Sequence, residues 1–244
     1  MNFTPTLLAL SVIALISGCA SNKDDVFIDN AKIEYEAAKK LVNTDNFNVA
    51  SDRLGKFSSN YPYSKLTVPA ELLRIYAAYK GNEYVLSETL SSTFIDRHPK
   101  HDNVDYAKYM LAMSYYKQRS SAEKDITMFK SSIEAFTRLL KEHPQSAYAK
   151  KGKDRLQSLH NALGKHELTI GKYYFDRDRF VASANRFQEV VRLYQTTPSI
   201  EEALYYLSAS YAKMGLKADA RQTAKLLRHN HPDSSWSSKV KEHL

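Results

Sequence analysis

Apolar and small residues recur every three or four positions in paired segments, which is the spacing of one face of an α-helix. Within a pair, small residues stand where two helices would touch, and larger apolar residues stand one turn away. The clearest pair carries Leu204, Leu207 and Tyr211, followed by Ala220, Ala224 and Leu227. The pattern predicts helix-turn-helix units and an all-α fold.

The second segment of most pairs ends on an aromatic residue or a histidine followed by proline. Proline disfavours helical backbone angles in the residue before it, so a helix tends to stop there. The junctions are Tyr61-Pro62, His98-Pro99, His143-Pro144 and His231-Pro232, with a fifth, proline-less junction at Tyr194-Gln195. Their separations are 37, 45, 51 and 37 residues. These steps fit the tetratricopeptide period of about 34 residues, with 3, 11, 17 and 3 residues added.

This resemblance predicts a tetratricopeptide-type (TPR-type) helical-repeat solenoid of about five units. Further matching positions are Ala38, Leu41, Ala50, Leu54 and Phe57 in unit one, Phe94 in unit two, Phe136 and Leu139 in unit three, and Gly171, Tyr174, Ser183 and Phe187 in unit four. We expect units one to three over residues 29–144, with a loop over residues 118–127. An additional helix over residues 145–163 would then join them to units four and five, which end at residue 244. Unrelated amphipathic helices that end in proline are the alternative.

The first 18 residues resemble a bacterial lipoprotein signal peptide. An apolar run from Leu7 to Ile16 is too short to span a membrane, and it ends in the lipobox Ile16-Ser17-Gly18-Cys19. By that resemblance, cleavage before Cys19 leaves a cysteine that carries a diacylglyceryl group and an N-acyl chain, followed by a tether over residues 19–28. Ala20 is not the aspartate that retains lipoproteins at the inner membrane, so we expect a lipid anchor on the periplasmic face of the outer membrane. An ordinary secretory signal or a short buried helix is the alternative, although Cys19 is the only cysteine.

The chain is basic, with 35 Lys and Arg against 27 Asp and Glu, a net charge of +8. Such an excess suits nucleic acid, anionic lipid or an acidic protein patch. A periplasmic location excludes nucleic acid. The basic residues are spread over helix faces, as expected of a solvated surface, but some could line a groove for an acidic partner.

Catalytic motifs are missing from the sequence. The seven glycines are isolated, so no phosphate-binding loop is predicted, and acylation of Cys19 would leave no thiol nucleophile. His98 and His101 are separated by Pro99 and have only Asp102 and Asp105 nearby, which fits exposed turn residues better than a metal site. We therefore expect no enzymatic activity, metal or cofactor other than the covalent lipid on Cys19.

A lipobox followed by five TPR units resembles the BamD (ComL) family of the outer-membrane β-barrel assembly machine. The stretches that carry the resemblance are residues 60–64, 72–80, 94–99, 101–110 and 165–186, which together span most of the chain. Two features depart from the family pattern. Ser64 replaces a glycine, and the loop around Arg119 to Ile126 is shorter.

The resemblance implies a binding protein with two working ends. Its N-terminal repeats would hold the C-terminal targeting signal of unfolded barrel proteins, and we assign this peptide site to Tyr35, Lys39, Tyr61, Tyr63, Arg74, Tyr76 and Tyr79. Tyr rings could receive an aromatic chain end, while Lys39 and Arg74 meet carboxylates. Core packing is the alternative role for Tyr76 and Tyr79.

The C-terminal repeats would dock on a POTRA domain of the barrel-forming, BamA-like subunit, and we assign this contact to Asn185 and Arg186. Other assembly lipoproteins and unfolded outer-membrane proteins are further expected partners. The alternative function is that of another periplasmic TPR lipoprotein, an adaptor for cell-wall enzymes or for secretin assembly. Only the motif stretches around Tyr61 and Arg186 separate the two functions.

Overall fold

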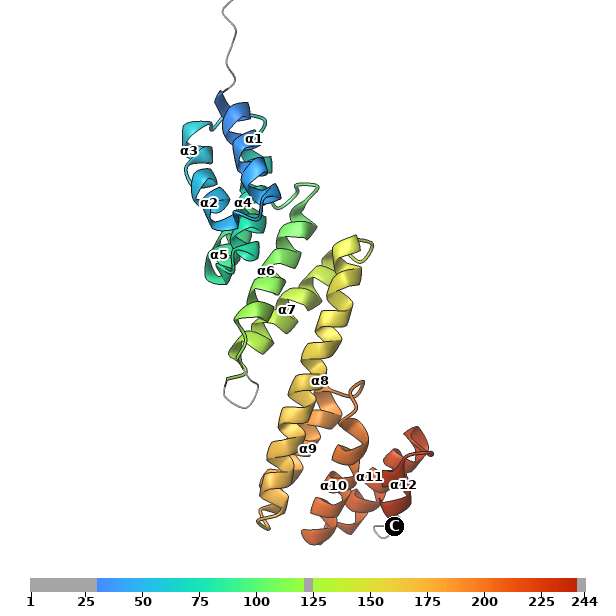
Figure 1. The fold of residues 1–244 in the computed structure, drawn as a ribbon. Helices are drawn as coiled ribbons and strands as arrows, with labels where there is room; N and C mark the ends of the chain where they lie inside the picture. Colours follow the sequence, from blue (N-terminus) through green and yellow to red (C-terminus); the bar gives the residue numbers. More distant parts are fainter. Residues whose placement is uncertain (1–29, 121–124, 241–244) are drawn as a thin grey trace, which may run out of the picture.

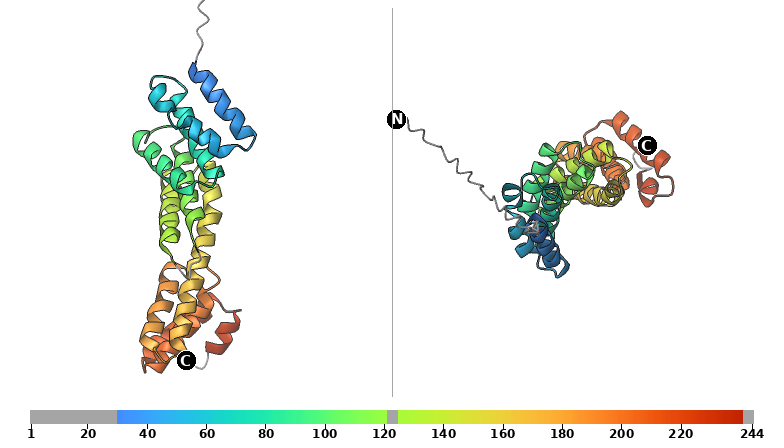
Figure 2. Two further views of the ribbon diagram at one scale, coloured as in Figure 1. Left: turned by 60° about the vertical axis from the view of Figure 1, so that its left-hand side comes forward. Right: turned by 90° about the horizontal axis from the view of Figure 1, so that it is seen from above.

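The computed structural model describes residues 30–120 and 125–240, and all regular structure in these ranges is helical. The predicted signal peptide, Cys19 and the tether lie outside the described residues. Figure 1 shows a chain of helices that runs from one end of the molecule to the other, and Figure 2 shows that it is elongated and curved. The all-α prediction is confirmed.

The helices form five successive pairs followed by a short terminal helix. They are α1 (Asn30–Asn43) with α2 (Phe47–Leu54) and α3 (Phe57–Asn60); α4 (Thr67–Lys80) with α5 (Tyr84–Arg97); α6 (Val104–Gln118) with α7 (Thr127–Glu142); α8 (Ala147–Phe175) with α9 (Phe180–Leu193); α10 (Ile200–Lys213) with α11 (Lys217–Asn230); and α12 (Ser235–Lys239). Each helix packs mainly on its neighbours in the chain. Contacts of this kind define a repeat solenoid, so the predicted repeat architecture is confirmed.

Four turns inside the pairs, all within the described ranges, use the same backbone device. Asp45, Asn82, Asp178 and Gly215 have φ of 57°, 64°, 54° and 77°, the left-handed region that ends many helices. The N–H of the following residue donates to the carbonyl five residues earlier, as in Glu83 to Ala78 at 2.9 Å. This Schellman geometry reverses the chain within a few residues and sets the second helix against the first.

The second helix of each pair ends at the predicted aromatic or histidine. Each of these five residues leaves the helical region, and its N–H still donates to the carbonyl four residues earlier, at 2.8 to 2.9 Å. The residues are Tyr61, His98, His143, Tyr194 and His231. In the first unit the second helix is divided into α2 and α3 by Gly55 and Lys56.

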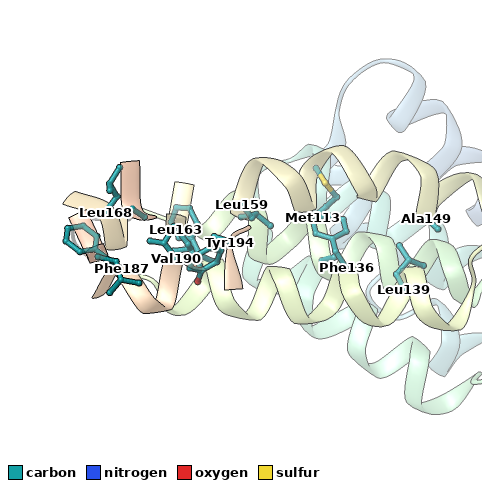
Figure 3. Packing of buried hydrophobic residues seen from close by; sticks show 14 of the residues in the cluster. Met113, Phe136, Leu139, Ala149, Leu159, Leu163, Leu168, Phe187, Val190 and Tyr194 are labelled. Atoms are coloured by element: carbon teal, nitrogen blue, oxygen red, sulfur yellow. The ribbon is translucent and has the colours of Figure 1, made fainter. Parts of the chain in front are cut away.

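Small residues lie where paired helices touch, as the sequence pattern predicts. A Cβ placed on Gly171 of α8 would lie 2.5 Å from the ring of Phe187 on α9, so only glycine permits this approach. Phe187 is fully buried, and burial of such a side chain contributes about 1.5–3 kcal/mol. Figure 3 shows Phe187 with Leu163, Leu168 and Val190 in the largest core cluster.

The additional helix expected over residues 145–163 is not a separate element. It continues without interruption into the first helix of unit four, so that α8 is one helix of 29 residues. Gly164 follows the expected boundary, but it stays helical, and its missing side chain allows α8 to approach Tyr194 and Thr197 closely. Buried Leu159, Leu163 and Leu168 keep the helical spacing across the boundary. One continuous helix therefore connects the N-terminal and C-terminal halves of the described fold (Figure 1).

Candidate peptide-binding and docking sites

The seven residues predicted to bind peptide are distributed over three places. Tyr35 and Lys39 lie on α1, Tyr61 and Tyr63 follow α3, and the remaining three lie on α4. Tyr35 packs on the core of unit one, and Lys39 Nζ lies 5.7 Å from the centre of its ring. Lys39 also pairs with Glu36 at 3.2 Å. This part of α1 is a solvated face with a local ion pair.

Tyr61 and Tyr63 have opposite environments although they are two residues apart. The Tyr61 ring is half-buried, and its centre lies 5.0 Å from that of the Phe57 ring. The backbone carbonyl of Tyr61 accepts a 2.6 Å hydrogen bond from Thr67 Oγ1. Tyr63 is 99% exposed. Tyr61 therefore fixes the turn into unit two, whereas Tyr63 lies free on the surface.

Tyr76 and Tyr79 lie one turn apart on α4. The ring centres of Tyr76 and Phe47 lie 6.2 Å apart in an edge-to-face arrangement, and those of Tyr79 and Tyr84 lie 5.7 Å apart. Both tyrosines are half-buried, so each packs on the fold while keeping part of its surface accessible. Burial raises the pKa of Tyr79 to about 12, with smaller contributions from neighbouring phenols. Arg74 is not part of this aromatic group, because it lines a cavity with residues of α2, α3 and α5.

Tyr76 and Tyr79 belong to a larger group of tyrosines on consecutive first helices. The group, which we call the tyrosine surface, comprises six half-buried residues on α4, α6 and α8: Tyr76, Tyr79, Tyr106, Tyr109, Tyr116 and Tyr148. The helices that carry it pack in order, α4 on α6 and α6 on α8. Ring centres of Tyr106 and Tyr109 lie 5.2 Å and 5.4 Å from that of Tyr148. Burial raises the pKa of Tyr106 well above its ordinary value, so its phenol stays neutral.

Basic side chains border one end of the tyrosine surface. The guanidinium carbon of Arg119 lies 3.5 Å from the ring centre of Tyr116, and that of Arg155 lies 5.5 Å from it. Burial raises the pKa of Tyr116, but a hydrogen bond with Ser158 and the two arginines outweigh this effect and bring it below the usual value. Lys151 lies 5.6 Å over the Tyr148 ring. The surface therefore combines aromatic rings, phenol donors and positive charge.

Sequence reasoning missed four members of this group. Tyr106, Tyr109, Tyr116 and Tyr148 were not among the residues assigned to the peptide site from sequence. A usable signal existed, since the first helices of consecutive repeats line one side of a solenoid. Tyrosines at related positions of three such helices could have been grouped on that basis.

The two residues predicted to dock a partner lie on α9 with different surroundings. Asn185 is exposed and lines an open groove of about 730 Å³ with Gln188, Glu189, Val191, Arg192 and Gln195. Arg186 points toward α8, where its Nη1 donates to Glu167 Oε2 at 3.1 Å. The side chains of Arg186 and Glu167 are 43% and 12% exposed. Arg186 is thus engaged within the chain, with its remaining N–H groups near the surface.

The described parts of the chain contain neither a clustered metal-ligand set nor a membrane-spanning helix. Residues 30–120 and 125–240 contain no group of three or more His, Cys, Asp or Glu side chains placed to hold a metal ion. His98, considered above as a possible ligand, instead contacts Glu71 at 2.9 Å. No helix in these ranges is long and apolar enough to cross a membrane.

The chain has the fold of a TPR-type helical-repeat protein, a class that acts by binding. Its helix pairs are stacked, four of its turns contain a residue with left-handed φ, and side chains of the first helices line one surface. Residues 29–227 match the family model described as "YfiO: Outer membrane lipoprotein". The chain is 32% identical to the outer membrane protein assembly factor BamD of Rickettsia prowazekii, over 98% of this chain and 96% of the relative. With these matches, the chain belongs to the BamD family.

Two other relatives agree over nearly the whole chain. The BamD of Caulobacter vibrioides is 26% identical over 95% of this chain and 77% of its own length. The BamD of Neisseria meningitidis serogroup A is 29% identical over 94% of this chain and 92% of its own length. The matched region, residues 29–227 of the family model, therefore includes the helices that carry the tyrosine surface and α9.

Proposed function

We propose that this chain is a lipid-anchored, non-catalytic scaffold subunit in the assembly of outer-membrane β-barrel proteins. The observation that carries the proposal is the family match over residues 29–227, together with relatives named outer membrane protein assembly factors. The TPR-type fold supports it, because stacked helix pairs provide extended surfaces for polypeptides.

The proposed location is the periplasmic face of the outer membrane. Cys19 and the preceding lipobox would provide the anchor, since each buried CH₂ of an acyl chain contributes about 0.8 kcal/mol and several chains together give stable attachment. Residues 19–28 would serve as the tether between the anchor and α1.

The proposed site for unfolded barrel proteins is the tyrosine surface. Half-buried phenols offer rigid apolar area and hydrogen-bonding hydroxyls at low conformational cost, which suits peptides of varied sequence. Arg119, Arg155 and Lys151 lie at its edge, where they could meet acidic groups of the peptide. Of the residues assigned from sequence, Tyr76 and Tyr79 belong to this surface. Tyr63 is exposed beyond it, and Tyr35, Lys39 and Tyr61 lie in unit one.

The proposed docking site for a POTRA domain of the barrel-forming subunit is the outer face of α9. Asn185 lines its groove, and Arg186 has N–H groups that Glu167 leaves unused. A carboxylate of the partner would share Arg186 with Glu167, because a guanidinium carries five donors in a planar fork.

The test is affinity purification of the native lipoprotein from detergent-solubilised outer membranes, followed by mass spectrometry. Recovery of a POTRA-bearing barrel subunit and other assembly lipoproteins is the expected result. Recovery of cell-wall hydrolases or a secretin in their place would overturn the proposal in favour of the adaptor function.

A further inference from the structure

The cavity that Arg74 lines is separate from the tyrosine surface. It lies between the second helices of units one and two. It has a volume of about 210 Å³. Its lining includes Leu54, Gly55, Glu71, Arg74, Leu90 and Arg97. The site thus joins an apolar wall from α2 and α5 to two guanidinium groups and one carboxylate.

Arg74 has no charged partner in this cavity. Among the described residues, its Nε is one of four buried side-chain polar atoms without a hydrogen bond, and it alone of the four is cationic. Its Nη2 lies 3.4 Å from the position that a Cβ would take on Gly55, so the missing side chain leaves room for the guanidinium. Arg74 as a whole is only half-buried, but a buried N–H without an acceptor is costly, and an anion is the acceptor that best suits a guanidinium.

The carboxylate of the cavity is already engaged by other groups. Glu71 Oε1 accepts from Arg97 Nη1 at 2.9 Å and from Ser58 Oγ at 3.0 Å. Its Oε2 lies 2.9 Å from His98 Nε2. Two arginines and one glutamate leave one excess positive charge, and that charge belongs to Arg74. The cavity is therefore complementary to a single negative group.

From this geometry we propose that Arg74 receives an acidic side chain, Asp or Glu, from a partner protein that docks across α2 and α5. The methylene stem of such a side chain would pass Leu54 and Leu90, and its carboxylate would meet the guanidinium in a charge-assisted pair. The C-terminal carboxylate of a peptide fits less well. The last backbone N–H of the peptide would be buried and would need an acceptor, but both oxygens of Glu71 are already engaged. This interface differs from the two surfaces of the proposed function and does not depend on them.

The test follows the Arg74 Nε–H signal in NMR spectra of the full chain, assigned by its loss in Arg74→Lys. Three probes are titrated: acetyl-Ala-Glu-Ala-amide, acetyl-Ala-Gln-Ala with a free carboxyl terminus, and inorganic phosphate. The proposal expects a saturable shift with the glutamate peptide, at least several-fold tighter than with the other probes. No saturable shift with the glutamate peptide, or an equal or stronger response to the chain end or to phosphate, would overturn the assignment.

A structural role for Arg74 is tested separately through Arg74→Met. An unpaired guanidinium that awaits a ligand does not stabilise the free protein, so the melting temperature should stay the same or rise. The binding response to the glutamate peptide should disappear in this variant. A marked fall in melting temperature would mean that Arg74 supports the fold instead, and would count against the proposed site.

Discussion

The two halves of the fold present candidate binding groups of opposite kinds. In the N-terminal half, six half-buried tyrosines lie on the successively packed helices α4, α6 and α8. In the C-terminal half, the candidate docking residue Arg186 is held by Glu167 across the closely packed α8 and α9. An aromatic surface can accept many sequences, whereas a charge fixed by an internal partner selects a matching charge in one geometry. The comparison separates the proposed surface for varied substrates from the proposed contact for one partner.

The largest expected effect concerns the packing of α8 against α9, which holds Arg186 beside Glu167. Phe187→Ala should lower the free energy of unfolding by about 3–5 kcal/mol, because it empties a fully buried position against Gly171. Chemical denaturation monitored by circular dichroism measures the loss. Val181→Ala on the same helix is the control, since Val181 is 65% exposed and should change stability by less than about 0.5 kcal/mol. Equal effects of the two variants would contradict the packing described for α8 and α9.

The next effect concerns docking at α9. Arg186→Glu should weaken binding of the POTRA-bearing subunit by about 2–5 kcal/mol, because it places a negative charge beside Glu167 and opposite the partner's carboxylate. Pull-down from solubilised membranes measures the recovery. Glu167→Gln is the matched control, since it removes the internal competitor and keeps Arg186 available. Wild-type recovery with Arg186→Glu would rule out this contact.

A smaller effect is expected on the tyrosine surface. Tyr109→Ala should weaken binding of a peptide from the C-terminal end of an outer-membrane barrel protein by about 1–2 kcal/mol, while Tyr109→Phe should retain most of the affinity because the ring remains. Fluorescence anisotropy with a labelled peptide measures both. Tyr63→Ala should have no effect, since this exposed side chain lies outside the surface. Equal affinity for all three variants would place peptide binding elsewhere.

The smallest effect is a pH dependence. Burial raises the pKa of Tyr79 to about 12, from an ordinary 10.0. The folded chain therefore binds this proton more tightly than the unfolded chain. The contribution of the proton to the free energy of unfolding is complete below pH 10 and is lost as pH rises toward 12. Ultraviolet difference titration of the wild type against Tyr79→Phe should show one phenol that ionises late. Ionisation near pH 10 would mean that Tyr79 is solvated.

The repeat fold was predictable because its signals are local. Proline after Tyr61, His98, His143 and His231 marks helix ends directly, and small residues such as Gly171 mark helix contacts one position at a time. The continuity of α8 was missed, because a repeat template places a boundary where no residue in the sequence enforces one.

The candidate sites were less predictable because they depend on which helix faces meet. Arg74 and Tyr76 are two residues apart on α4, yet Arg74 lines a cavity with α2 and α5 while Tyr76 belongs to the tyrosine surface. Sequence proximity grouped them into one pocket, and helical rotation separates them. The Arg186–Glu167 pair was equally hidden, since its partners are 19 residues apart on different helices.

Site-specific photo-crosslinking of the full chain in living cells tests most directly whether the tyrosine surface and the α9 groove bind different partners. A photoreactive phenylalanine analogue at Tyr109 samples the tyrosine surface, and the same analogue at Gln188 samples the α9 groove. We predict crosslinks from position 109 to several unfolded outer-membrane proteins, and from position 188 to one POTRA-bearing subunit. Crosslinks from both positions to the same single partner, or none to unfolded proteins from position 109, would contradict the account.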